Sequence, residues 1–289
     1  YEGKAFYAMF GLTTGGILNI LGDYILVSKL GMGVYGAGLA TAASQVISFC
    51  ILLFMYQKMA QSSIRFRAVS KELKLYLSVC RVGFPSLIRQ GLTSVTTGVL
   101  NNVTKPFGDA AIAAMSVVSR YSNFLMCVGL GMGQGFQPVA SFNFQAGKYD
   151  RVKKGLLFTT TFGLACVGGM ALLSMLFAEP IIYVFQKHEE VIEIGARALR
   201  FAAFGMLFMP LSTPVNMLYQ SIQQPAISSM LSLIRSGAIT IPLLLFAVPI
   251  LGLTGIQIAQ PTADVLAGIC SIPFIFRFLH SYQETPSGQ

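Results

Sequence analysis

Long stretches without a single Asp, Glu, Lys or Arg constrain the fold of this chain more than any other feature. They cover residues 30–57, 121–147, 155–178, 201–234 and 236–263. Each is longer than the ~20 apolar residues with which an α-helix crosses a ~30 Å hydrocarbon core. Charged residues make up only 11% of the chain, against about 25% in a soluble domain. The sequence therefore predicts an all-α, polytopic membrane protein that is embedded in a lipid bilayer.

Hydropathy and flanking charge predict about eight transmembrane helices. Their approximate ranges are 8–28, 36–57, 83–103, 110–138, 154–178, 198–220, 228–250 and 254–278. The connections 58–81 and 143–154 are rich in Lys and Arg, whereas 179–193 is acidic. Because basic loops stay in the cytoplasm, we expect these two basic loops and both chain termini on the cytoplasmic side.

An internal repeat predicts the architecture. Residues 33–45 (GVYGAGLATAASQ) align without gaps on residues 252–264 (GLTGIQIAQPTAD). An even number of predicted spans separates the two stretches, so both run across the membrane in the same direction. The pattern is that of a two-lobe transporter with parallel repeats about an axis along the membrane normal.

A six-helix repeat unit divides the chain into parts and predicts roughly 140 missing residues, four helices, upstream of Tyr1. The expected parts are residues 1–57 as the last two helices of an N-terminal lobe, 58–81 as a cytoplasmic amphipathic linker, 82–279 as a complete six-helix C-terminal lobe, and 280–289 as a cytoplasmic tail.

Two opposite charges lie deep in otherwise apolar spans. Arg120 and Asp264 are each ten residues from the outer end of their predicted helix, or about 15 Å. A charge at this depth is costly and marks a functional site by default. We therefore expect Arg120 and Asp264 to pair, with Pro261 loosening the turn beside the carboxylate. A purely structural buried ion pair is the alternative. The arginines Arg89 and Arg235 lie nearer the predicted cytoplasmic ends and can snorkel.

Other polar residues within spans are candidates for an ion or substrate pathway. Asn19 and Asp23 stand one turn apart in the first span, although Asp23 could be a simple interfacial carboxylate. Gln134 and Gln137 precede Pro138, and buried amides need partners.

Several chemistries are disfavoured by the pattern. The GxGxxG match at 31–36 falls in a short loop between two spans rather than after a strand, so it does not indicate a dinucleotide site. No GxxxxGK[ST] motif is present, so no nucleotide partner is expected. The two histidines and five scattered cysteines lack metal-ligand spacing. The net charge of +9 gathers in loops, which is typical of membrane topology and not of nucleic-acid binding. We expect no catalytic residues, no metal and no enzymatic activity.

The sequence resembles the multidrug and toxic compound extrusion (MATE) family over its whole length. The most specific match is GMGQGFQPVASFNFQAGKYDRVKK at 131–154, with further matches at NILGD (19–23), GVYGAGLAT (33–41) and GFPSLIRQ (83–90). The resemblance implies helices five to twelve of a monomeric antiporter in the bacterial inner membrane. It also implies export of cationic amphipathic compounds in exchange for Na⁺ or H⁺, with no further cofactor.

The chain also departs from the family. The spans 83–103 and 198–220 contain no Asp or Glu, although one branch of the family places cation-binding acids there. The coupling site is thus Asp23, Asp264 or a residue outside this sequence. A lipid-linked oligosaccharide flippase of the same superfamily is the first alternative, and it would show more basic residues at depth. A channel is less favoured, because polar groups at depth are few and clustered.

Overall fold

The structure, a computed structural model, describes residues 5–59 and 72–281. These residues form helices and turns and contain no strand. The chain divides into two compact units, Tyr1–Lys71 and Glu72–Gln289. Half of the predicted linker 58–81 falls on residues 60–71, which lie outside the described part, and residues 73–81 begin the first helix of the second unit.

The first unit is a pair of helices. Helix α1 (Ala5–Asp23) continues as the π-helical segment η1 (Tyr24–Lys29), and α2 (Gly33–Met59) returns beside it. The two helices approach closely at glycines: a Cβ on Gly15 would lie 2.7 Å from the Ser48 Cβ. Ser48 also donates a hydrogen bond to the Gly11 carbonyl at 2.9 Å. Small residues of this kind let helices associate within a bilayer, where burial of apolar surface gives no driving force.

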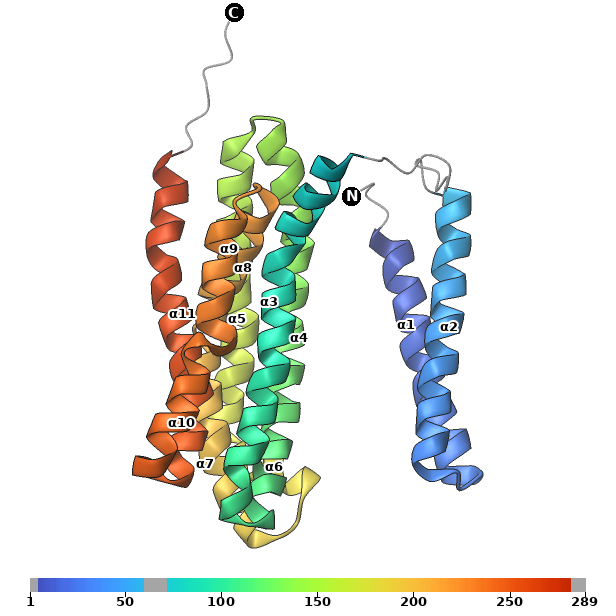
Figure 1. The fold of residues 1–289 in the computed structure, drawn as a ribbon, viewed down its shortest axis with the longest axis vertical. Coiled ribbons are helices and arrows are strands. Elements are labelled where there is room, and N and C mark those ends of the chain that lie inside the picture. Colours follow the sequence, from blue (N-terminus) through green and yellow to red (C-terminus); the bar gives the residue numbers. More distant parts are fainter. Residues whose placement is uncertain (1–4, 60–71, 282–289) are drawn as a thin grey trace, which may run out of the picture. The chain divides into compact units, whose positions relative to one another are not determined.

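The second unit is a bundle whose helices run up and down with short connections (Figure 1). Its elements are α3 (Leu73–Thr104), η3 (Lys105–Phe107), α4 (Asp109–Gln145), α5 (Tyr149–Leu176), α6 (Ala178–Phe185), α7 (Glu189–Met206), α8 (Met209–Ser221), α9 (Pro225–Leu233), η4 (Ile234–Ala238), α10 (Thr240–Leu251) and α11 (Leu253–Ser281).

Helices α4 and α11 organise this bundle. Helix α4 packs on α5, α7 and α8, while α11 packs on α7, α8 and α10, and α3 lies along α9. Buried apolar side chains fill the contacts, among them Leu199, Leu244 and Ile256 in one cluster and Leu156 and Phe278 in another. Because α3 and α11 lie far apart in the sequence but pack in one bundle, the fold brings their polar residues together.

Six helical stretches of the described residues are long and apolar enough to cross a membrane. They are Met9–Lys29, Gly33–Lys58, Asp109–Gln145, Tyr149–Leu176, Pro225–Leu251 and Leu253–Ser281. The remaining two predicted spans correspond to α3, which is long but polar, and to α7 with α8. The break between α7 and α8 precedes Pro210, which lacks a backbone N–H and sits at the start of α8. The predicted outer loop 179–193 holds α6 and the first turn of α7.

The structure strengthens the internal repeat. Gly33 and Gly252, which the alignment equates, both have positive φ, at 55° and 58°; Gly33 is the first residue of α2 and Gly252 directly precedes α11. Gly36 and Gly255 are equated too, and a Cβ on either would meet a carbonyl oxygen of the preceding helix, Leu26 or Ala247, at 3.0 or 2.8 Å. The glycines of the GxGxxG stretch therefore serve a tight turn between two helices.

The loop charges make the topology testable. In a cysteine-free background, Glu189→Cys should react with a membrane-impermeant maleimide added outside intact cells, because loop charge places 179–193 outside. Lys148→Cys should react only after the cells are opened. Labelling of position 189 only from the cytoplasm would reverse the predicted orientation.

Candidate functional site

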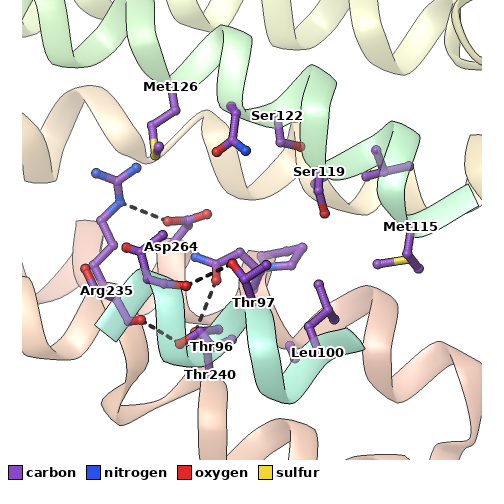
Figure 2. A pocket seen from close by; sticks show the side chains of 18 of the residues that line it. Thr96, Thr97, Leu100, Met115, Ser119, Ser122, Met126, Arg235, Thr240 and Asp264 are labelled. Atoms are coloured by element: carbon purple, nitrogen blue, oxygen red, sulfur yellow. Dashed lines mark hydrogen bonds and ion pairs between the residues drawn. The ribbon is translucent and has the colours of Figure 1, made fainter. Parts of the chain in front are cut away.

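A cavity of about 190 Å³ lies inside the second unit, between α3, α4, α7, α10 and α11. Hydroxyl groups line much of it: Thr93, Thr96 and Thr97 come from α3, and Ser119 and Ser122 come from α4 (Figure 2). This combination of a mostly apolar wall and convergent polar groups is typical of small-molecule sites.

Among the residues that line the cavity, Arg235 and Asp264 form an ion pair. Arg235 donates from Nε to the Asp264 carboxylate at 3.1 Å and from a terminal nitrogen to the Thr213 hydroxyl at 3.3 Å. The two side chains are only 16% and 9% exposed. A buried pair of this kind offsets the desolvation of its two charges only while both partners are present.

The local backbone brings these two residues together. Arg235 lies on η4, a π-helical segment between α9 and α10, and the Thr96 hydroxyl of α3 donates to the Ser236 carbonyl of η4 at 2.9 Å. Asp264 is held from the other side, because α11 lies so close to α7 that a Cβ on Gly205 would be 2.7 Å from the Pro261 Cα. π-Segments are frequent at functional sites.

The predicted pair of Arg120 and Asp264 is wrong. Asp264 pairs with Arg235, while Arg120 is exposed on α4 and does not line the cavity. Arg120 and Asp264 were predicted to lie at the same depth in the membrane, but depth does not determine which face of α4 carries Arg120. Successive helical residues are rotated by about 100°, so Ser119 faces the cavity and its neighbour Arg120 does not.

The expectation that Arg235 snorkels to the cytoplasmic surface is also wrong. Helix α9 begins at Pro225 rather than at the predicted 228, so Arg235 is ten residues from the helix start, or about 15 Å. Its side chain turns inward to Asp264. An interior carboxylate offers the guanidinium a charge-assisted bond that a snorkelling side chain would not make.

The remaining candidates of the second unit lie apart from the cavity, with one exception. Pro261 lines it, three residues before Asp264. Gln134 is exposed. Gln137 is half-buried, and its main-chain carbonyl accepts a hydrogen bond from the Ser221 hydroxyl at 3.3 Å. These two amides are not brought to the site.

Asn19 and Asp23 form a separate polar site in the first unit. Asn19 donates from its amide nitrogen to the Thr41 hydroxyl of α2 at 3.2 Å. One turn further on, the Asp23 Oδ1 atom is buried and has no hydrogen-bond partner among the described residues. A buried acceptor without a partner carries the full cost of its lost hydration.

Sequence reasoning expected Arg89 to snorkel rather than to line the cavity, and it missed Gln257 and the serine and threonine residues of the cavity. Arg89 lies on α3 at the cavity wall, and Gln257 lies on α11 two turns before Asp264. One signal was available for α3: Thr93, Thr96 and Thr97 recur at helical spacing and mark one polar face. The serines of α4 carried a similar signal, because Ser119 and Ser122 stand three residues apart and share one face of the helix.

Taken together, these helices define a polytopic helical membrane protein whose second unit contains a cavity lined by polar and apolar side chains. A family model described as MatE matches residues 85–246. The chain belongs to this family.

Relatives and solved structures agree with that assignment. The multidrug export protein MepA of Staphylococcus saprophyticus is 22% identical over 275 residues, which cover 95% of this chain and 60% of the relative. The chain thus spans about 60% of the length of the curated relatives that it matches. A multidrug resistance MATE family transporter in an outward-facing conformation matches with a TM-score of 0.87 and 23% identity, over 98% of this chain and 64% of that one.

A third match is a MOP superfamily transporter from Pyrococcus furiosus whose binding pocket is described as having reverse polarity. It matches with a TM-score of 0.83 and 23% identity, over 96% of this chain and 63% of that chain. At these identities the structural matches show that the fold is that of MATE transporters.

Proposed function

We propose that this chain belongs to an efflux transporter that exports amphipathic organic compounds in exchange for Na⁺ or H⁺. The relatives named as multidrug export proteins support export, and the family and the internal cavity support a small-molecule substrate. The transporter works in this proposal as a monomer in the bacterial inner membrane, with the lipid bilayer as its surroundings and without a nucleotide.

The observation that carries cation coupling is the buried Asp23 Oδ1 atom, which has no partner among the described residues. A Na⁺ ion or a proton would satisfy this oxygen, and the neighbouring Asn19 and Thr41 side chains supply further oxygens of the kind that hard cations prefer. Asp264 is the weaker candidate, because Arg235 already neutralises it.

Coupling follows if occupancy of Asp23 changes the balance between two arrangements of the transporter. Alternating access in secondary transporters arises when one repeat rocks against the other around a central site. A cation that binds one arrangement more tightly shifts the population toward it by its differential affinity. In this proposal, Asp23 binds the cation and the cavity of the second unit binds the substrate.

Purified protein in liposomes tests this proposal. A cation gradient should drive the movement of a fluorescent amphipathic dye, and Asp23→Asn should reduce the gradient-driven rate by roughly tenfold or more, because coupling free energies of 1–3 kcal/mol are typical. Asparagine keeps the shape of the side chain and removes the charge. Both a cationic and an anionic dye are assayed.

The matched control is Asp109→Asn, which removes an exposed carboxylate at the start of α4. It should transport at the wild-type rate. If Asp23→Asn kept the full cation dependence, the coupling site would lie elsewhere, and transport unaffected by Na⁺ or pH gradients would contradict cation coupling itself.

A further inference from the structure

The charge of the cavity in the second unit is unbalanced. The ionisable side chains among its described lining residues are Arg89, Arg235 and Asp264. Two guanidinium groups thus face one carboxylate, which leaves one positive charge in excess. The resemblance to exporters of cationic compounds implies the opposite sign, because a cationic substrate would be repelled here.

Arg89 supplies the excess charge. Its guanidinium is half-buried on α3 and makes no ion pair or side-chain hydrogen bond within residues 5–59 and 72–281. An uncompensated guanidinium beside a membrane cavity is costly unless something pairs with it. Its planar array of five donors matches a carboxylate or a phosphate, to which it can bind through two parallel hydrogen bonds.

The cavity is also polarised from end to end. Arg235, Asp264 and Met126 lie toward one end in Figure 2, and Leu100 and Met115 lie toward the other. Leu244 and Ile256 add to the apolar wall. By chain position, Leu100 is four residues from the Thr104 end of α3, whereas Arg89 is fifteen residues from it. A ligand that fits both ends has a charged head and an apolar body.

We propose that this cavity binds organic anions whose carboxylate or phosphate head pairs with Arg89 and whose apolar body lies along Leu100, Met115 and Ile256. Asp264 acts as the internal counter-ion of Arg235 when no anion is bound. Binding at this cavity stands on its geometry alone, whereas export of such anions rests on the transport function proposed above.

This arrangement makes Asp264 a competitor of the ligand. An oxyanion that reaches Arg235 must displace the Asp264 carboxylate from the Nε atom, with which it now bonds at 3.1 Å. Removing the charge of Asp264 should therefore tighten anion binding, while removing the charge of Arg89 should weaken it. A cation-binding cavity predicts the reverse for both variants.

Calorimetric titration of the purified protein in phosphatidylcholine nanodiscs tests the proposal. The probes are benzoate and phenyl phosphate, with trimethylphenylammonium as the cationic counterpart of the same aromatic body. Wild type should bind the two anions and not the cation. Arg89→Gln should weaken benzoate binding by about tenfold or more, as expected for loss of hydrogen bonds to a charged group. Asp264→Asn should tighten it severalfold.

Arg277→Gln is the matched control, because Arg277 is an exposed arginine of α11 outside the cavity. It should bind benzoate as wild type does. Repeating the titration in nanodiscs with phosphatidylglycerol separates two sources of the head group: loss of benzoate binding there assigns the site to a lipid phosphate, and unchanged binding assigns it to free organic anions.

Tighter binding of trimethylphenylammonium than of benzoate, or benzoate binding that is indifferent to Arg89→Gln, would overturn the proposal. Asp23→Asn separates this outcome from failure of the transport proposal, since it should reduce cation-driven transport and leave benzoate affinity unchanged. Anion binding without cation-driven transport would contradict only the function proposed above.

Discussion

Replacing Asp264 with alanine should lower the free energy of unfolding by about 3–5 kcal/mol, the usual cost of leaving one charge of a buried pair without its partner. Arg235 is 16% exposed, and among the residues that the structure describes Asp264 is its ionic partner. Thermal unfolding of the purified protein in detergent measures the loss. Asp264→Asn should cost less, because the amide oxygen still accepts a hydrogen bond from Arg235.

Two comparisons identify the cause of this loss. Glu193→Ala breaks the exposed pair of Glu193 with Arg197, whose side chains are 77% and 60% exposed, and should change stability by less than about 1 kcal/mol. The double variant Asp264→Leu with Arg235→Met should recover much of the stability lost by Asp264→Ala, since apolar replacement of both charges of a buried pair is often neutral. A double variant as unstable as the single one would show that packing, rather than the stranded charge, sets the cost.

Replacing Gly205 with alanine should destabilise the second unit by about 1–3 kcal/mol, the range for overpacking a close contact. The added Cβ would lie 2.7 Å from the Pro261 Cα and 3.1 Å from the Pro261 carbonyl oxygen. Backbone atoms cannot move aside as a flexible side chain can, so α7 and α11 must separate. The same separation would shift Asp264, one turn further along α11, and should also weaken substrate-dependent transport.

Gly169→Ala is the matched control in α5, where an added Cβ meets no atom within 4 Å. It should leave stability unchanged or raise it by up to about 1 kcal/mol, because alanine has the higher helix propensity. Equal unfolding temperatures for the two variants would contradict the close approach of α7 to Pro261.

The helical fold could be predicted from local information. In uncharged runs such as 121–147 and 236–263, an α-helix satisfies the backbone hydrogen bonds within the bilayer. The basic loops predict the orientation of these helices in the membrane. The repeated glycines were visible as well: Gly33 and Gly252 were aligned by sequence, and both prove to have positive φ in the turn that leads into a helix. The boundaries were less secure, and the break before Pro210 divided a predicted single span.

The partner of Asp264 could not be predicted in the same way. Depth along the chain put Arg120 and Asp264 at one level, but depth does not specify which way each side chain points around its helix. A shift of three residues in the start of α9 also moved Arg235 from the expected interface into the bundle.

Local sequence was enough to show that this chain forms apolar helices, where polar groups interrupt them, and that Asp23 and Asp264 are the acids within the predicted spans. The three-dimensional structure was needed to show that Asp264 pairs with Arg235, that Asp23 has a buried oxygen without a partner among the described residues, and that Arg89 faces the cavity. The reason is physical: hydropathy is a property of each segment, whereas an ion pair depends on the rotation and packing of helices that are far apart in the chain.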